Sequence, residues 1–86
     1  MAEEQPIGKA THYFGNLGVA VLSLTGRLRV GDMVHLKGPK TDFTQTVTSM
    51  QIDRQNIEEA KPGDDVALKV DEKVREGDVM LFVASS

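Results

Sequence analysis

The residues that could do chemistry in this chain are few, and their spacing excludes most kinds of site. The stretch Gly26-Arg27-Leu28-Arg29-Val30-Gly31 has the two-glycine spacing of a phosphate-binding loop. Asp32-Met33 follows it, where such a loop has a lysine and a hydroxyl residue. Those two residues bind the phosphates and the magnesium ion, so we expect no nucleotide site here.

Metal-dependent and nucleophilic catalysis have no better support in the sequence. The two histidines, His12 and His35, are far apart, and there is no cysteine. Since a metal site needs several converging ligands, we expect no metal and no other cofactor. No serine has a recognisable nucleophile setting. The paired carboxylates lie in turn-like, solvated segments that do not suit acid–base catalysis, namely Glu58-Glu59, Asp64-Asp65 and Asp71-Glu72. The chain is therefore predicted not to be an enzyme.

Nucleic-acid binding has more support, because basic residues cluster around one predicted hairpin. The net charge is −3, but residues 1–40 contain five basic and three acidic residues, whereas residues 41–86 contain five and ten. Basic residues near aromatics suit a surface that follows a nucleic-acid backbone and stacks bases. The alternative is that Phe14 is a core residue and the basic residues solvate an edge strand. The residues concerned are Arg27, Arg29, Lys37 and Lys40, with the aromatics of His12-Tyr13-Phe14 nearby.

The elements that must position these residues are short strands with alternating apolar residues. The stretch Gly26–Leu36 is predicted to be a short strand, a tight turn at Gly31-Asp32 and a second strand. Leu28 and Val30 share one face before the turn. One helical turn is allowed over Asn56–Ala60, ended by Lys61-Pro62-Gly63. Further strands are predicted over residues 7–14, 18–24, 43–53, 66–70 and 79–83.

Three Gly-Asp pairs each precede the apolar start of a strand. Glycine can take the positive φ that a tight turn requires, and aspartate can accept hydrogen bonds from nearby backbone donors. We therefore predict that these pairs build turns and have no catalytic role. They are Gly31-Asp32, Gly63-Asp64 and Gly77-Asp78.

The longest predicted strand, Phe43–Asp53, contains a change of phase. Phe43 and Val47 have odd numbers, whereas Met50 and Ile52 have even numbers, so a regular strand cannot place all four on one face. Either the strand crosses from one packing layer to another, or a bulge near residues 48–49 shifts the phase.

Six or seven short strands and no amphipathic helix predict an all-β fold. In 86 residues, closure into a small antiparallel β-barrel best removes exposed sheet edges. We expect one domain over residues 6–84, with tails at 1–5 and 85–86. No apolar run reaches the length of a membrane span, and neither a secretory signal nor a cysteine is present. A cytoplasmic protein without membrane contact is therefore expected, and the oligomeric state is left open.

Four stretches, taken in order, resemble the second domain of translational GTPases. This is the small β-barrel after the GTP-binding domain in elongation factor Tu, elongation factor one-alpha and initiation factor two. The resemblance covers residues 7–83. It implies a free-standing, translation-factor-like barrel that is a non-catalytic binding module contacting tRNA or ribosomal RNA. The stretches are Gly18–Val21, Thr25–Val34, Val47–Gln51 and Glu58–Val66.

The resemblance also implies an altered binding pocket. In elongation factor Tu this barrel helps to hold the aminoacyl end of tRNA. The family's glutamate, aromatic residue and arginine match Gln51, Asp53 and Arg54, and only Arg54 keeps its type. The family's asparagine falls at Asp65. Arg54 thus joins the predicted RNA contacts. The alternative is a protein–protein adaptor that kept the barrel and lost the RNA site. A similar barrel also occurs as an appended domain in some collagenase-like peptidases, so this fold does not fix the partner.

Overall fold

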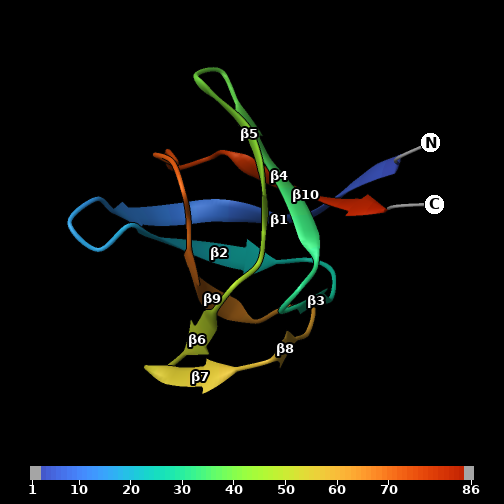
Figure 1. Cartoon of the computed structure of the whole chain (residues 1–86), viewed down its shortest axis with the longest axis vertical. Helices are drawn as coiled ribbons and strands as arrows, with labels where there is room; N and C mark the ends of the chain where they lie inside the picture. Colours follow the sequence, from blue (N-terminus) through green and yellow to red (C-terminus); the bar gives the residue numbers. More distant parts are fainter. Residues whose placement is uncertain (1–2, 85–86) are drawn as a thin grey trace.

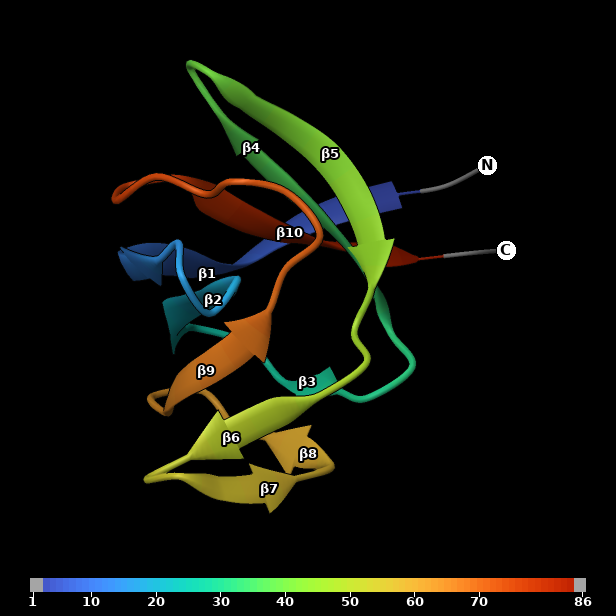
Figure 2. The same cartoon turned by 60° about the vertical axis from the view of Figure 1, so that its left-hand side comes forward.

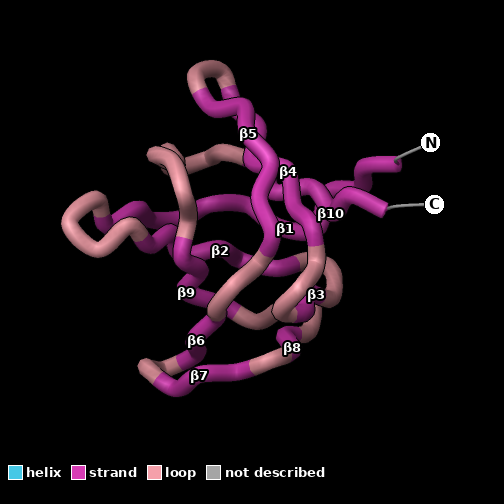
Figure 3. The backbone as a smooth tube through the Cα atoms, viewed as in Figure 1, coloured by secondary structure: helices cyan, strands magenta, loops and turns pink. Residues whose placement is uncertain are grey.

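A computed structural model describes residues 3–84, which form ten β-strands (Figures 1 and 3). The all-β class is confirmed. Within residues 3–84 there is no helix long and apolar enough to cross a membrane. The strands are β1 (Glu3–Phe14), β2 (Val19–Leu24), β3 (Leu28–Arg29), β4 (Met33–Gly38), β5 (Thr41–Thr46), β6 (Met50–Ile52), β7 (Gln55–Ile57), β8 (Glu59–Ala60), β9 (Asp65–Lys69) and β10 (Val79–Ala84).

Eight strands form one antiparallel sheet in the order β5-β4-β10-β1-β2-β9-β6-β7, and β3 pairs separately with β8. The sheet curls around its buried face, but its hydrogen-bonded order ends at β5 and at β7 (Figure 2). The predicted closed barrel of six or seven strands is therefore corrected to an open sheet of eight strands with a two-stranded ribbon beside it.

The core lies on the inner face of this curled sheet. Alternation explains its composition, since β2 and β5 bury every second residue. Seventeen hydrophobic residues form one buried cluster, among them Leu22, Leu36, Leu68 and Met80, each fully buried. Phe82 packs against the edge of this cluster and is only partly buried.

The predicted strand over residues 43–53 is divided into β5 and β6. Between them, the backbone N–H of Val47 donates to the carbonyl of Asp32 at 2.8 Å. The N–H of Gly31 donates to the carbonyl of Val47, also at 2.8 Å. The chain therefore leaves the ladder to bond with the Gly31-Asp32 turn. Val47 and Met50 can both be buried because the strand is broken between them. The change of phase is therefore made by a break in the strand and not by a single bulge.

The Gln45 side chain explains how the open sheet still encloses a core. Its Nε2 donates to the carbonyl of Lys69 at 2.8 Å, and its Oε1 accepts from the N–H of Asp71 at 2.8 Å. Gln45 is only 5% exposed. A buried side-chain amide thus bonds β5 to the end of β9, where a closed barrel would have a ladder of backbone hydrogen bonds.

Two further expectations are corrected in the middle of the chain. The helical turn expected over Asn56–Ala60 is replaced by β7 and β8. The strand β3 pairs with β8 and has no pairing with β4, although the Gly31-Asp32 turn lies between β3 and β4. Val30 consequently does not share the buried face of Leu28 and is 41% exposed. The partner of β3 is set by tertiary packing, which local alternation does not reveal.

The described ends of the chain lie side by side (Figure 1). Glu3 pairs with Ala84, so residues 3–5, expected within a tail, lie in β1. Residues 1–2 and 85–86, expected as tails, lie outside the described residues. The strand β2 pairs with β1 only from Gly8 onward, and β4 pairs with β10 only up to Phe82. The paired ends of β1 and β10 therefore extend beyond their neighbours as a two-stranded ribbon.

Candidate functional site

The three Gly-Asp pairs form three turns of one design. The glycines Gly31, Gly63 and Gly77 have φ angles of +99°, +94° and +91°. In each turn the aspartate Oδ2 accepts a hydrogen bond of 2.8–2.9 Å from the backbone N–H three residues earlier. The aspartate N–H donates back to the carbonyl of that same residue. All three carboxylates therefore stabilise turns, and the residues that they bond are Arg29, Lys61 and Arg75.

The predicted RNA-binding residues do not converge on one surface. Arg29 Nε donates to Glu59 Oε2 at 2.7 Å, so its charge is already paired across β3 and β8. Lys40 lies in the turn between β4 and β5, and Arg54 lies between β6 and β7. These two hairpins are at opposite ends of the molecule (Figures 1 and 2). It stays a prediction that any of the five basic residues, Arg27 and Lys37 included, contacts a partner.

Most residues of the altered binding pocket, which the resemblance implied, lie in one β-hairpin. Asp53 and Arg54 are the two turn residues between β6 and β7, with φ angles of +51° and +66°. Gln51 Nε2 donates to the Asn56 side-chain oxygen across the hairpin at 2.9 Å. Asp65 begins β9 and pairs with Ser23 of β2. In this structure these residues shape the backbone, and binding by them stays a prediction.

Replacing Arg54 with glycine is expected to stabilise the protein by about 0.5–1 kcal/mol. Two positive φ angles are typical of a type I′ hairpin turn, for which Asp-Gly is a favoured pair. Arginine has a Cβ that disfavours this conformation. Urea unfolding measures the change, and Arg54→Ala is the control because it removes the same charge but keeps the Cβ. Equal stability of the two variants would contradict this explanation.

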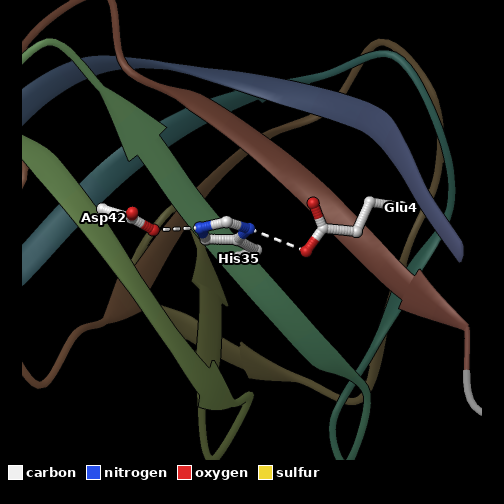
Figure 4. A network of polar contacts seen from close by, with 3 residues as sticks. All are labelled: Glu4, His35 and Asp42. Atoms are coloured by element: carbon white, nitrogen blue, oxygen red, sulfur yellow. Dashed lines mark hydrogen bonds and ion pairs between the residues drawn. The ribbon is translucent and has the colours of Figure 1, made fainter. Parts of the chain in front are cut away.

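A cluster that sequence reasoning missed joins three strands through His35 (Figure 4). Its Nδ1 is 2.7 Å from Glu4 Oε2, and its Nε2 is 2.5 Å from Asp42 Oδ1. Glu4 belongs to β1, His35 to β4 and Asp42 to β5, with β10 lying between β1 and β4. The His35 side chain is 13% exposed. Sequence spacing gave no signal, because Glu4 was expected in a tail.

The geometry of this cluster determines what it can do chemically. The hydrogen bond with Asp42 and the contact with Glu4 raise the pKa of His35 above 6.5, although partial burial opposes them. When protonated, the ring donates from both nitrogens to carboxylates. Neither nitrogen is free to accept a proton from a nucleophile, so this histidine does not have the geometry of a general base. Within residues 3–84 no three potential ligands are placed to hold a metal ion.

The free energy of unfolding should fall as the pH rises through the pKa of folded His35. A histidine whose pKa is raised on folding contributes stability that is complete below pH 6.5 and lost above its folded pKa. Lys37 is on the same face and pairs with Asp42 in the ladder. Urea unfolding at pH 5.5 and pH 9 tests this. His35→Gln should lose the dependence, whereas His12→Gln, at an exposed histidine, should keep it; matching pH profiles for all three proteins would contradict it.

The fold matches that of a domain already solved from another protein. The C-terminal domain of a putative U32 peptidase from Geobacillus thermoleovorans superposes with a TM-score of 0.84 and 24% identity, over 88% of this chain and 89% of that one. The selenomethionine variant of the same domain gives the same TM-score and identity, over 96% of its chain. At this identity the likeness shows the fold alone. No protein-family model matches.

Two curated proteins are more similar in sequence than these solved structures. A collagenase of Porphyromonas gingivalis is 36% identical over 74 residues, which are 84% of this chain and 20% of that protein. An uncharacterized protease of Methanocaldococcus jannaschii is 36% identical over 73 residues, 84% of this chain and 18% of that one. The chain thus spans about a fifth of the length of these relatives.

These comparisons correct the expectations drawn from translation factors. The relatives are named collagenase and protease, and the structural neighbours are domains of a U32 peptidase. The translation-factor resemblance, the RNA-binding module and the adaptor alternative are therefore contradicted. So is the prediction that the chain is not an enzyme, because the relatives are named collagenase and protease. The quoted stretches contain turn and strand residues, and such residues do not fix a function.

Proposed function

We propose that this chain takes part in peptide-bond hydrolysis as a β-domain of the collagenase and U32-peptidase type. The observation that carries the proposal is the 36% identity over 74 residues with the collagenase of Porphyromonas gingivalis. The fold shared with the C-terminal domain of a putative U32 peptidase supports it independently. Because the match spans a fifth of the collagenase, the chain would act together with the remaining four fifths of such a protein.

The geometry is compatible with a role in holding polypeptide substrate. The sheet has open ends at β5 and β7, and the ribbon of β1 and β10 extends beyond β2 and β4. Unpaired strand edges can bind extended polypeptides through main-chain hydrogen bonds, whatever the side-chain sequence. Such recognition suits a protease whose substrate is an unfolded chain.

A domain replacement tests this proposal. In the Porphyromonas gingivalis collagenase, the matched segment is either deleted or replaced by residues 3–84 of this chain. Hydrolysis of heat-denatured collagen is followed by the release of amino groups. We expect deletion to remove most of the activity and replacement to restore it, because the two segments are 36% identical over 74 residues.

Two controls make the replacement experiment decisive. An unrelated β-domain of similar size in the same position should not restore hydrolysis. This chain alone is assayed in parallel, because hydrolysis by the chain alone would assign the activity to these 86 residues. A folded replacement protein that remains as inactive as the deletion would contradict the proposal.

A further inference from the structure

A groove lies where the ribbon of β1 and β10 leaves the rest of the sheet. One hollow of about 440 Å³ is bounded by Gln5–Ile7 of β1, by Arg27 and by Phe82. A second hollow of about 580 Å³ lies toward Met33 and Ala84. Both are lined by Phe82 and Asp32, so they adjoin at these two side chains. The groove is therefore open, with an aromatic side chain between its two halves.

Within residues 3–84, the apolar surface of the groove is partly exposed. Phe82 packs against the core cluster but remains partly exposed, and Met33 is 40% exposed. Ile7 is buried at the inner end of the first hollow. An apolar side chain entering here would lose contact with water against Phe82, and this burial would favour binding.

The polar groups at the rim favour an anion beside that apolar side chain. Arg27 has no ion-pair partner within residues 3–84, whereas Arg29 is bonded to Glu59 at 2.7 Å. The Asp32 carboxylate, which lines both hollows, accepts from the Arg29 N–H at 2.9 Å in its own turn. It would repel a bound carboxylate, so that carboxylate has to lie on the Arg27 side of the groove. A guanidinium matches a carboxylate through two parallel hydrogen bonds. Arg27 is thus the group at this rim that is available for a carboxylate.

The neighbouring strand edge offers main-chain groups to the same ligand. Residues 3–6 of β1 pair with β10 on one side and, within the described residues, have no partner strand on the other. Along this free edge of β1, hydrogen bonding begins at the Ile7 carbonyl. That carbonyl accepts from the N–H of Thr25 at 2.7 Å and from the N–H of Gly26 at 3.2 Å. An extended peptide can therefore lie along β1 with its end at Arg27.

We propose that this groove binds the carboxyl-terminal end of a peptide whose last side chain is apolar. The terminal carboxylate bonds with Arg27, the last side chain packs on Phe82, and the preceding backbone lies along β1. This inference names a ligand class for the proposed function and rests on it for its biological meaning, because each peptide-bond hydrolysis creates a new carboxyl terminus.

The test is a ¹⁵N-NMR titration of the whole chain with acetyl-Ala-Ala-Leu as the free acid and as the carboxamide. We expect shifts at Ile7, Gly26 and Phe82, and about tenfold weaker binding of the carboxamide, because a charge-assisted pair is lost. Arg27→Gln should weaken binding of the acid by about tenfold and make the two peptides bind alike. Lys40→Gln removes the same charge at a distant turn and should keep the wild-type difference.

Each other outcome would overturn the inference. Equal binding of the acid and the carboxamide to the wild-type protein would exclude recognition of a carboxyl terminus. An unchanged preference in Arg27→Gln, or shifts elsewhere on the sheet, would exclude this groove, and so would an absence of binding at millimolar peptide. Because the titration involves no hydrolysis, its failure is distinct from failure of the domain replacement.

Discussion

Replacing Gly38 with alanine is expected to lower the free energy of unfolding by about 2–4 kcal/mol, the largest single effect that we predict. A Cβ at this position would lie 2.6 Å from Asp78 Cγ and still closer to Oδ1. Asp78 is 2% exposed, and its Oδ2 is held by the Arg75 N–H at 2.8 Å. This short side chain cannot move away without breaking the turn that begins β10.

Thermal unfolding followed by circular dichroism measures the effect. In a domain of this size, the expected loss lowers the melting temperature by at least about 8 °C. Gly15→Ala is the control, because its Cβ would meet only Tyr13 Cε2 at an ordinary 3.5 Å. If the free energy of unfolding of Gly38→Ala is within about 0.5 kcal/mol of the wild-type value, the close approach of Asp78 does not require a glycine at position 38.

Replacing Gln45 with leucine should cost about 2–3 kcal/mol, because two backbone groups lose their partners. The change removes the acceptor for the Asp71 N–H and the donor to the Lys69 carbonyl. Leucine has a similar volume, so the loss is attributable to the hydrogen bonds more than to a cavity. Urea unfolding at neutral pH measures the loss.

Two further variants make this prediction specific. Gln51→Leu also removes a side-chain amide hydrogen bond, but at an exposed hairpin, and should cost less than about 0.5 kcal/mol. Gln45→Glu keeps an acceptor for Asp71 and loses the donor to Lys69 when ionised. Its stability should therefore recover at acidic pH, where the protonated acid donates again. Equal losses in the leucine variants of Gln45 and Gln51 would show that the bridge between β5 and β9 is not important.

Gln45 and His35 each bond strands that are not neighbours in the sheet. Gln45 bonds β5 to the end of β9, so the sheet encloses its apolar face without a complete ladder. At another place in the sheet, the ribbon of β1 and β10 extends beyond its neighbours β2 and β4. His35 fixes the outer face of that region by bonding Glu4 to the hairpin of β4 and β5.

The all-β class and the approximate positions of most strands could be predicted from the sequence. Alternating apolar residues marked β4 and β9, because a strand buried on one face must alternate, and runs of apolar residues marked β2 and β10. The Gly-Asp pairs correctly indicated turns. A turn involves only four consecutive residues, so the positive φ of the glycine and the side-chain acceptor of the aspartate can be recognised from local sequence. The change of phase between Val47 and Met50 indicated an irregular strand, and the structure has a break there.

The contacts between residues far apart in the sequence were revealed by the three-dimensional structure. The partner of β3, the bridge from Gln45 to Lys69 and the cluster of Glu4, His35 and Asp42 all depend on how the sheet curls. The same is true of the groove at Arg27 and Phe82, which exists because β1 and β10 extend beyond β2 and β4. A local sequence pattern shows that a segment alternates like a strand, but it does not show which other strand pairs with it. Contacts between distant residues therefore could not be deduced from residue spacing.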